Sequence, residues 1–237
     1  MEITIQNGNT RAIIDPRGAW LTNLSDDSGD IMFPKRNLVA EDGSTRQRGG
    51  CHVCLPNFGP GGESALPQHG FGRVADWELA DKTESSVLLT LRKGEGNYSD
   101  MESVVAYQLG DNRLVMTLEV VNNGQADVRV APAFHPYFAL HDEQDVTIDG
   151  AKESLNTLEE TQFVEGGTTH TLEASGRKLT LTSPELQTWA EWTDRLGDYV
   201  CVEPTLGGYM FLKNEPTKQE ILQPGESKTY SFTVSWA

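Results

Sequence analysis

Basic residues, cysteines and long apolar runs are all scarce in this sequence. Of its 237 residues, 19 are Lys or Arg and 35 are Asp or Glu, so the formal net charge is −16. Nucleic acids and anionic membrane surfaces both attract a basic protein face, and the shortage of Lys and Arg argues against either partner. No apolar stretch approaches the ~20 residues that a membrane-spanning helix needs. We therefore expect no nucleic acid and no membrane among the partners.

Cysteine is represented only by Cys51, Cys54 and Cys201. Such an odd and small number does not form a disulfide framework and is typical of a reducing compartment. The first residues, Met1 to Gln6, lack a basic region followed by an apolar run, so they do not resemble a signal peptide. These observations predict a cytoplasmic protein. The 8 Phe, 6 Tyr and 5 Trp residues argue against a disordered chain.

A helical pattern is also missing, because we find no apolar 3.6-residue period longer than about three turns. The dominant period is two, and Val, Ile, Thr and aromatic residues are frequent in these segments, as in strands. Turn-forming residues such as Gly110-Asp111-Asn112 separate the segments, so residues 102–130 are predicted to form an antiparallel meander. The predicted strands cover residues 86–91, 102–107, 113–121, 178–182 and 228–236.

Antiparallel strands joined by short turns predict an all-β fold with two packed sheets, a large antiparallel β-sandwich. No Gly/Ser-rich or Pro-rich linker divides the chain and no repeat is visible, so we predict a single domain over residues 1–237. Residues 43–70 are loop-like over a long span and carry seven Gly and three Pro. Long ordered loops are often functional, and the aromatic, Cys and His residues in this one indicate an ordered loop.

The segment from Cys51 to Cys54 has the CxxC spacing of a redox pair or of half a zinc site. The sequence offers neither a second such pair nor the βαβ context of a redox motif. In an extended strand, Cys51 and Val53 face one way, and His52 and Cys54 face the other. We therefore interpret the segment as a buried strand in which free Cys packs as a small apolar residue, with the metal or redox role as the alternative.

His69 lies between Gln68 and Gly70 in a loop, where a His has no core to fill. Nearby glycines allow the backbone to come close to a ligand. Arg73 and Trp77 follow, and a fixed cation with a flat apolar face suits the hydroxyl and C–H groups of a sugar. The alternative is a loop His that only hydrogen-bonds to the backbone.

His135 is surrounded in the sequence by apolar and aromatic residues, among them Phe134 and Tyr137. Pro136 restricts His135 to extended conformations, which fixes the direction of the imidazole. A His with a pKa near its ordinary value of about 6.5 donates or accepts a proton at neutral pH. The alternative is a buried His whose hydrogen bonds are satisfied.

Glu203 ends an otherwise apolar segment and is followed by Pro204. Strand alternation places Tyr199, Cys201 and Glu203 on one face of this segment. A carboxylate in such a position is paired, capped or functional, and the alternative is a rim carboxylate in water. A His and a Glu across a cleft move two protons, one as acid and one as base, and a nearby carboxylate favours the protonated His.

Short motifs follow one another along nearly the whole chain. They are Arg48-Gly49-Gly50, Pro56-Asn57-Phe58-Gly59, His69-Gly70-Phe71-Gly72-Arg73, His135-Pro136-Tyr137-Phe138, Val202-Glu203-Pro204 and Leu222-Gln223-Pro224-Gly225-Glu226. In these motifs and their order the sequence resembles the galactose mutarotase-like (aldose 1-epimerase) superfamily, and within it the hexose-6-phosphate 1-epimerase-like branch of bacteria and fungi. The family fold is a large antiparallel β-sandwich, in agreement with the period-two pattern.

The resemblance implies an isomerase that interconverts the α and β anomers of an aldohexose or its 6-phosphate. His135 matches the family's general acid, which protonates the ring oxygen, and Glu203 matches its general base, which removes the proton of the C1 hydroxyl. The ring opens to the aldehyde, the C1–C2 bond rotates, and the ring closes on the other face with the two roles exchanged. This chemistry implies no metal and no organic cofactor.

The resemblance also implies residues that hold the sugar. His69 matches a sugar-binding His, whereas Arg48 and Arg73 match cations that help to hold the phosphate in the phosphate branch, a role that guanidinium groups suit. The family has a further carboxylate near the sugar, for which Asp194 is our candidate. The partner implied is a sugar or sugar phosphate, bound by a monomer or homodimer. The chain is shorter than most family members.

Two questions stay open at this point. A carbohydrate-binding protein without turnover would use the same His and Arg residues on the same scaffold. The net charge of −16 argues against an anionic substrate, yet the candidate loop carries Arg46, Arg48 and Arg73. A local cationic pocket inside an acidic shell is compatible with a phosphate group, although long-range repulsion opposes its approach.

Overall fold

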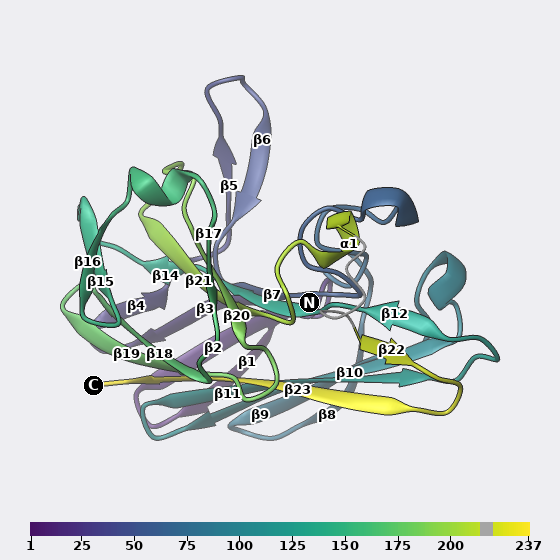
Figure 1. Cartoon of the computed structure of the whole chain (residues 1–237). Helices are drawn as coiled ribbons and strands as arrows, with labels where there is room; N and C mark the ends of the chain where they lie inside the picture. Colours follow the sequence, from purple (N-terminus) through teal and green to yellow (C-terminus); the bar gives the residue numbers. More distant parts are fainter. Residues whose placement is uncertain (214–219) are drawn as a thin grey trace.

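The chain folds almost entirely into β-strands, as the period-two pattern predicts. The computed structural model describes residues 1–213 and 220–237, and within them two large antiparallel sheets of ten and nine strands pack on one another (Figure 1). The predicted all-β fold, a large antiparallel β-sandwich, is therefore confirmed.

The ten-stranded sheet contains short strands, and its central members β7, β13 and β21 are buried along their whole length. Such strands have both faces covered. In pairing order its strands are β1 (Ile3–Asn7), β2 (Thr10–Asp15), β3 (Trp20–Asp26), β4 (Gly29–Met32), β14 (Phe138–Ala139), β21 (Tyr199–Thr205), β13 (Ala133–Pro136) and β7 (Cys51–Cys54), with β20 (Thr188–Trp192) and β17 (Gln162–Glu165) joined through β21.

The nine-stranded sheet contains the longest strands, and alternate side chains of its central members β10, β11 and β23 are buried. Each of the five strands predicted from the sequence is found in it. In pairing order its strands are β16 (Ala151–Ser154), β15 (Asp145–Ile148), β18 (Thr169–Ala174), β19 (Arg177–Thr182), β23 (Ser227–Trp236), β11 (Arg113–Asn122), β10 (Met101–Gly110), β9 (Ser86–Leu91) and β8 (Glu78–Lys82).

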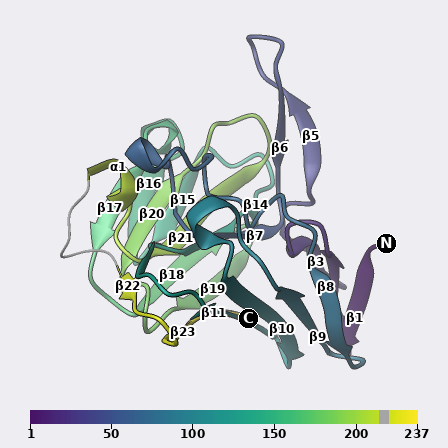
Figure 2. The ribbon, with the colours of Figure 1, turned by 90° about the vertical axis from the view of Figure 1, so that its right-hand side faces the viewer.

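The remaining elements are small. A hairpin of β5 (Arg36–Val39) and β6 (Thr45–Arg48) forms its own two-stranded sheet and stands away from the body in both views (Figures 1 and 2). A second small sheet joins β12 (Val128–Val130) to β22 (Glu220–Leu222). The described helical segments are η1 (Gly62–Ser64), η2 (Gly96–Tyr98), η3 (Thr157–Glu159) and α1 (Met210–Lys213).

Two local predictions need correction. The meander over residues 102–130 is right for β10 and β11, but β12 leaves the sheet and β11 pairs with β23 instead. The Asn122 side chain donates hydrogen bonds to the carbonyls of Ala126 and Leu222, which turns the chain towards β22. Residues 43–70 are not one loop, because β6 and β7 lie within them.

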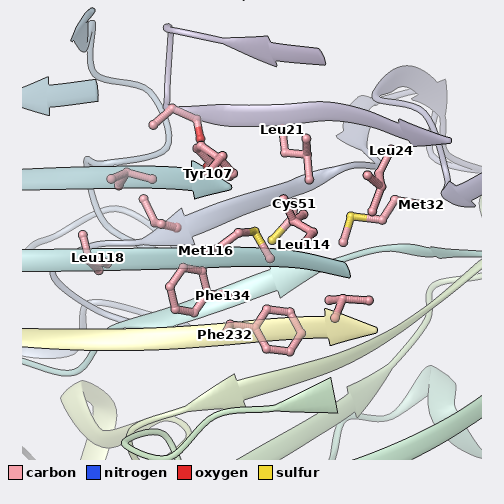
Figure 3. Close-up of a cluster of buried hydrophobic side chains, with 14 of the residues drawn as sticks. Leu21, Leu24, Met32, Cys51, Tyr107, Leu114, Met116, Leu118, Phe134 and Phe232 are labelled. Atoms are coloured by element: carbon pink, nitrogen blue, oxygen red, sulfur yellow. The ribbon is translucent and has the colours of Figure 1, made fainter. Parts of the chain in front are cut away.

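The core lies between the two sheets and takes side chains from both. Phe134 of β13 and Phe232 of β23 pack with ring centroids 5.8 Å apart, and Figure 3 shows them beside Met116 and Leu114. The hydroxyl of Tyr107 donates a hydrogen bond to the carbonyl of Ala19, which ties the nine-stranded sheet to the first strands of the other. This core fixes the ten-stranded sheet from one side and leaves its other face for the site.

Candidate active site

Four neighbouring strands, β7, β13, β21 and β20, carry the candidate site on the face away from the nine-stranded sheet. His52 of β7 lies opposite His135 of β13, and Glu203 of β21 lies opposite Ala190 of β20. Since Ala133 pairs with Thr205, the antiparallel register also places Glu203 beside His135. His52, His135 and Glu203 therefore form one row across the sheet.

The opposite faces of these strands enter the core, as alternation requires. Val53, Phe134 and Val202, each next in sequence to a residue of the row, belong to the apolar cluster between the sheets. The predicted alternation in β7 and β21 is thereby confirmed. Glu203 is not a rim carboxylate in water, because its side chain is buried and two further residues of β21 follow it.

His135 and Glu203 meet at the floor of a cavity. Nδ1 of His135 and Oε2 of Glu203 are 3.3 Å apart, and the two residues are 3% and 2% exposed. The angles between these two atoms are unsuitable for a hydrogen bond, and neither atom has another hydrogen-bond partner among the described residues. The structure thus brings together the two residues expected as acid and base.

Burial determines where a proton resides in this pair. Burial raises the pKa of the Glu203 carboxyl well above its ordinary value. Burial also lowers the pKa of His135 well below its ordinary value, and His52 and His69 add to this effect. The expectation that Glu203 favours a protonated His135 is therefore wrong for the free protein. A neutral carboxyl beside a neutral imidazole is favoured, because desolvation of both charges outweighs their attraction.

Other rings hold the imidazole of His135 in place. Tyr137 stacks on it with centroids 4.6 Å apart and an interplanar angle of 8°, and His52 and His69 contact it at 4.8 and 5.0 Å. Trp192 meets it edge-on at 6.2 Å. The fixed orientation predicted from the following proline is therefore reinforced by packing from several segments.

The cavity above the pair has a volume of about 450 Å³. Five of the six predicted site residues line it, namely His69, Arg73, Arg48, His135 and Glu203. Cavities of this size bind small molecules, and both polar groups and aromatic rings line this one. The further lining residues are Phe58, Pro67, Gln68, Gly70, Val74, Tyr137, Thr161, Trp192 and Tyr209.

His69 reaches the cavity from a tight turn. Its φ is +62°, and a side chain on the following Gly70 would come within 2.0 Å of the Leu55 carbonyl oxygen, so the turn requires glycine there. The Gly59 amide donates to Nδ1 of His69 at 3.2 Å, which leaves the hydrogen on Nε2. Burial, with Arg73 and Arg48, lowers the pKa of His69 to about 3. His69 is therefore neutral near pH 7, and its Nε2 lies 3.2 Å from Nε2 of the Gln68 side chain.

Arg48 and Asp194 form a partly buried ion pair. Nε of Arg48 lies 2.8 Å from Oδ2 of Asp194, and the Tyr199 hydroxyl donates to the other carboxylate oxygen. The guanidinium also covers the ring of Trp192 at 5.5 Å. Asp194 does not line the cavity. Its geometry suits a residue that positions Arg48, and the predicted sugar contact has no support from this arrangement.

Arg73 lines the cavity with its guanidinium 5.5 Å from the ring of Trp20. It forms no ion pair within the described part of the chain. The prediction that Trp77 provides an aromatic face for a sugar is wrong. Trp77 is only 4% exposed, it packs in the core, and its indole N–H donates a hydrogen bond to the Gly72 carbonyl. Trp192 provides the aromatic ring at the cavity wall instead. The pairing of β20 with β21 brings it there, although it is distant from Arg73 in the sequence.

Sequence reasoning missed several residues of the site. His52 was read only as part of a buried strand, yet its ring contacts His135 and its Nε2 is buried without a hydrogen-bond partner in the described residues. Phe58 and Tyr209 stack with centroids 5.6 Å apart at the cavity wall. The register of β7 and β13 would have identified His52, whereas no local signal identifies Tyr209.

No helix among residues 1–213 and 220–237 is long and apolar enough to cross a membrane.

Comparisons with known proteins bear on the fold and the family. A family model described as aldose 1-epimerase matches residues 1–174. Two curated proteins named "Putative glucose-6-phosphate 1-epimerase" match, one from Salmonella typhimurium at 29% identity over 129 residues and one from Cenchrus ciliaris at 25% over 186. These matches cover 51% and 70% of this chain but 42% and 56% of the relatives, so the chain spans about half their length.

A solved structure, that of a galactose mutarotase-like protein from Lactobacillus casei, has the same fold. The TM-score is 0.82 over 100% of both chains, at 18% sequence identity.

Proposed function

This chain belongs to the aldose 1-epimerase family, and on that premise we propose that it is a carbohydrate 1-epimerase that interconverts the α and β anomers of an aldohexose or hexose 6-phosphate. The observation that carries the proposal is the buried pair of His135 and Glu203, 3.3 Å apart at the floor of the cavity. A cavity for binding alone has no use for two adjoining proton-transfer groups.

Anomer exchange needs one group that protonates the ring oxygen and one that removes the proton of the C1 hydroxyl. We assign these roles to His135 and Glu203, respectively. In the free protein burial favours the proton on the Glu203 carboxyl, so this proton first passes to Nδ1 of His135, 3.3 Å away, once the two side chains align into a hydrogen bond. The Nε2 hydrogen of His135 then goes to the ring oxygen while the Glu203 carboxylate accepts the C1 hydroxyl proton.

The remaining steps return the pair to its starting state. The pyranose opens to the aldehyde, the C1–C2 bond rotates, and ring closure on the other face reverses both proton transfers with the sugar. The Nδ1 proton of His135 then returns to Glu203. No co-reactant is consumed. Each positioned group contributes roughly 10²–10⁴-fold to the rate.

The arginines support a substrate that carries a phosphate. Arg73 has no ion-pair partner in the described chain, and Arg48 uses Nε for Asp194 and Nη1 for the Gln47 carbonyl, which leaves Nη2. Guanidinium groups bind phosphate oxygens well. The name of the curated relatives, glucose-6-phosphate 1-epimerase, agrees with this choice. We also propose that residues 1–237 form one domain, since both large sheets share a core.

The test is anomer equilibration followed by NMR with glucose, galactose and glucose 6-phosphate in parallel. We expect acceleration of all three relative to buffer if the scaffold is an epimerase, and the largest acceleration for glucose 6-phosphate. Equal acceleration of the three sugars would remove the phosphate assignment while leaving the epimerase assignment intact.

The variant Glu203→Gln separates turnover from binding. Glutamine keeps the shape and the neutral charge of the protonated carboxyl but cannot serve as a base, so we expect exchange to be lost and sugar binding by calorimetry to be largely retained. Loss of both together, or of neither, would contradict the assignment. If the wild-type protein binds a sugar but does not exchange its anomers, the alternative of a non-catalytic carbohydrate-binding protein is supported.

A further inference from the structure

Three different metal-ligating groups meet on the site face of the sheet. One ring nitrogen of His135, Sγ of Cys201 and a carboxylate oxygen of Glu203 all lie within 4.8 Å of one another. The arrangement follows from the register, because Cys201 and Glu203 are two residues apart on β21 and so share a face, and His135 is the cross-strand neighbour of Glu203. All three side chains are buried.

Two of these groups have lone pairs without a partner. Nδ1 of His135 and Oε2 of Glu203 are buried and form no hydrogen bond within the described residues, although they lie 3.3 Å apart. A buried polar atom without a partner is costly and calls for an explanation such as a water or an ion. Cys201 is a free thiol, and it needs no disulfide partner to act as a ligand.

The separation of the unpartnered atoms fits tetrahedral zinc. Zinc binds His nitrogen at about 2.0–2.1 Å and carboxylate oxygen at about 2.0–2.2 Å, so the edge between these ligands in a tetrahedron is about 3.3–3.5 Å. The edges to a cysteine sulfur are about 3.5–3.7 Å, so Cys201 has to move inward by at most about 1.3 Å. A mixed nitrogen, sulfur and oxygen set suits zinc and disfavours magnesium and calcium, which prefer oxygen.

We propose that His135, Cys201 and Glu203 bind a divalent zinc ion, and that the bound ion inhibits the enzyme. The Cys201 thiol and the Glu203 carboxyl each release a proton to solvent when they coordinate the ion. The fourth position is open to the cavity, since His135 and Glu203 line it. The ion then occupies the lone pairs that proton transfer needs, so binding and turnover exclude each other. The binding site stands on its own geometry, and only the inhibition rests on the proposed function.

Cobalt(II) is the probe, because it takes zinc sites and shows a near-ultraviolet charge-transfer band when a thiolate is bound. The metal-free full chain is titrated with cobalt and then with zinc, and the dissociation constant is measured for wild type and Cys201→Ala. Two matched controls use the other buried thiols: Cys54→Ala on the site face of β7, where Sγ lies 3.4 Å from Nδ1 of His69, and Cys51→Ala on its core face.

We expect one equivalent of cobalt with a thiolate band in wild type and in both controls, and no band in Cys201→Ala. Removal of a ligand should raise the zinc dissociation constant at least about tenfold. If Cys201→Ala fails to fold, Cys201→Ser keeps the volume, and the same loss of the band is expected. Zinc should also inhibit anomer exchange, with each variant compared with its own metal-free rate.

Several results would overturn the site. These are the absence of stoichiometric cobalt binding, a thiolate band that survives in Cys201→Ala, or a band lost in Cys54→Ala instead, which would move the ion to His69. A band that depends on Cys201 in a protein that exchanges no anomers would support the site and refute the proposed function.

Discussion

The two faces of the central ten-stranded sheet are both buried, but they differ in what they contain. On β13, Phe134 enters the core and packs against Phe232 of the other sheet, whereas its neighbour His135 turns to the cavity. On β21, Val202 and Glu203 divide in the same way. On β7, β13 and β21, one face packs into the apolar core, and the other holds polar atoms without hydrogen-bond partners among the described residues.

This contrast separates stability from chemistry at the level of adjacent residues. The core face stabilises the sandwich through burial of apolar surface. The site face retains buried groups whose desolvation is unfavourable for folding, a cost that is tolerated where such groups have a function. Substitutions on adjacent residues should therefore affect different measurements, activity on the site face and stability on the core face.

His135→Asn should lower the rate of anomer exchange by roughly 10²–10⁴-fold, because the proton donor is lost while the surrounding rings stay in place. The rate is measured by NMR, and the melting temperature is measured alongside. We expect a smaller change in melting temperature than for a core residue, since His135 lies outside the apolar cluster between the sheets. If His135→Asn is largely unfolded but its folded fraction exchanges anomers at the wild-type rate, His135 is a structural residue and not part of the site.

Phe134→Ala, one residue earlier, should lower the free energy of unfolding by about 3–5 kcal/mol through loss of a fully buried ring and the cavity left behind. Denaturant unfolding measures this value. At low temperature, where the variant is still folded, anomer exchange should remain within a small factor of wild type. A large rate loss without a stability loss would show that the two faces are not separable.

Asp194→Asn should release Arg48 from its fixed position. Hydrogen bonds between charged groups are worth about 1.5–3 kcal/mol, so we expect roughly a tenfold rise in KM for glucose 6-phosphate and little change in kcat. Glucose serves as the matched substrate without phosphate and should be affected less. Equal effects on both sugars would place Asp194 at the sugar ring, as the sequence resemblance implies, and not behind Arg48.

Glu191→Gln tests the core-side face of β20, because Glu191 points away from its neighbours Ala190 and Trp192 at the site. Burial, with Glu153 and Asp149, raises the pKa of Glu191 to about 7. A carboxyl with a raised pKa in the folded state destabilises the fold as pH rises from about 4.5 to about 7, and the loss persists above that.

The Glu191→Gln variant should therefore melt a few degrees higher than wild type at pH 8, and at the same temperature as wild type near pH 4. Thermal denaturation across this range measures the difference. Anomer exchange should be unchanged. A stabilisation that is independent of pH would mean that packing, not ionisation, explains the effect.

The sequence predicted some elements well because their signals are local. The long strands β10, β11 and β23 show alternating burial, and their period of two is visible in the sequence itself. The candidate residues His135 and Glu203 were found through neighbouring prolines and family-like motifs, which are also local. His69 was found because a His between Gln and Gly in a loop has no core to fill.

Other features were missed because they depend on partners that are distant in the chain. The sequence predicts Trp77 as the sugar-contacting ring, and only packing sends Trp77 to the core and brings Trp192 to the cavity. Pairing of β12 with β22 was likewise invisible, because it is set by the C-terminal part of the chain. Asp194 was identified as a polar site residue, but its ion pair with Arg48 was not.

Short-range patterns are enough to predict the all-β class, the strand alternation and the candidate pair of His135 and Glu203. Tertiary structure decided how those residues act. Only the register of β7, β13 and β21 places His52, His135 and Glu203 in one row, and only burial reverses the expected ionisation of the acid–base pair. Solvation of a charge depends on everything packed around it, and no local pattern contains that information.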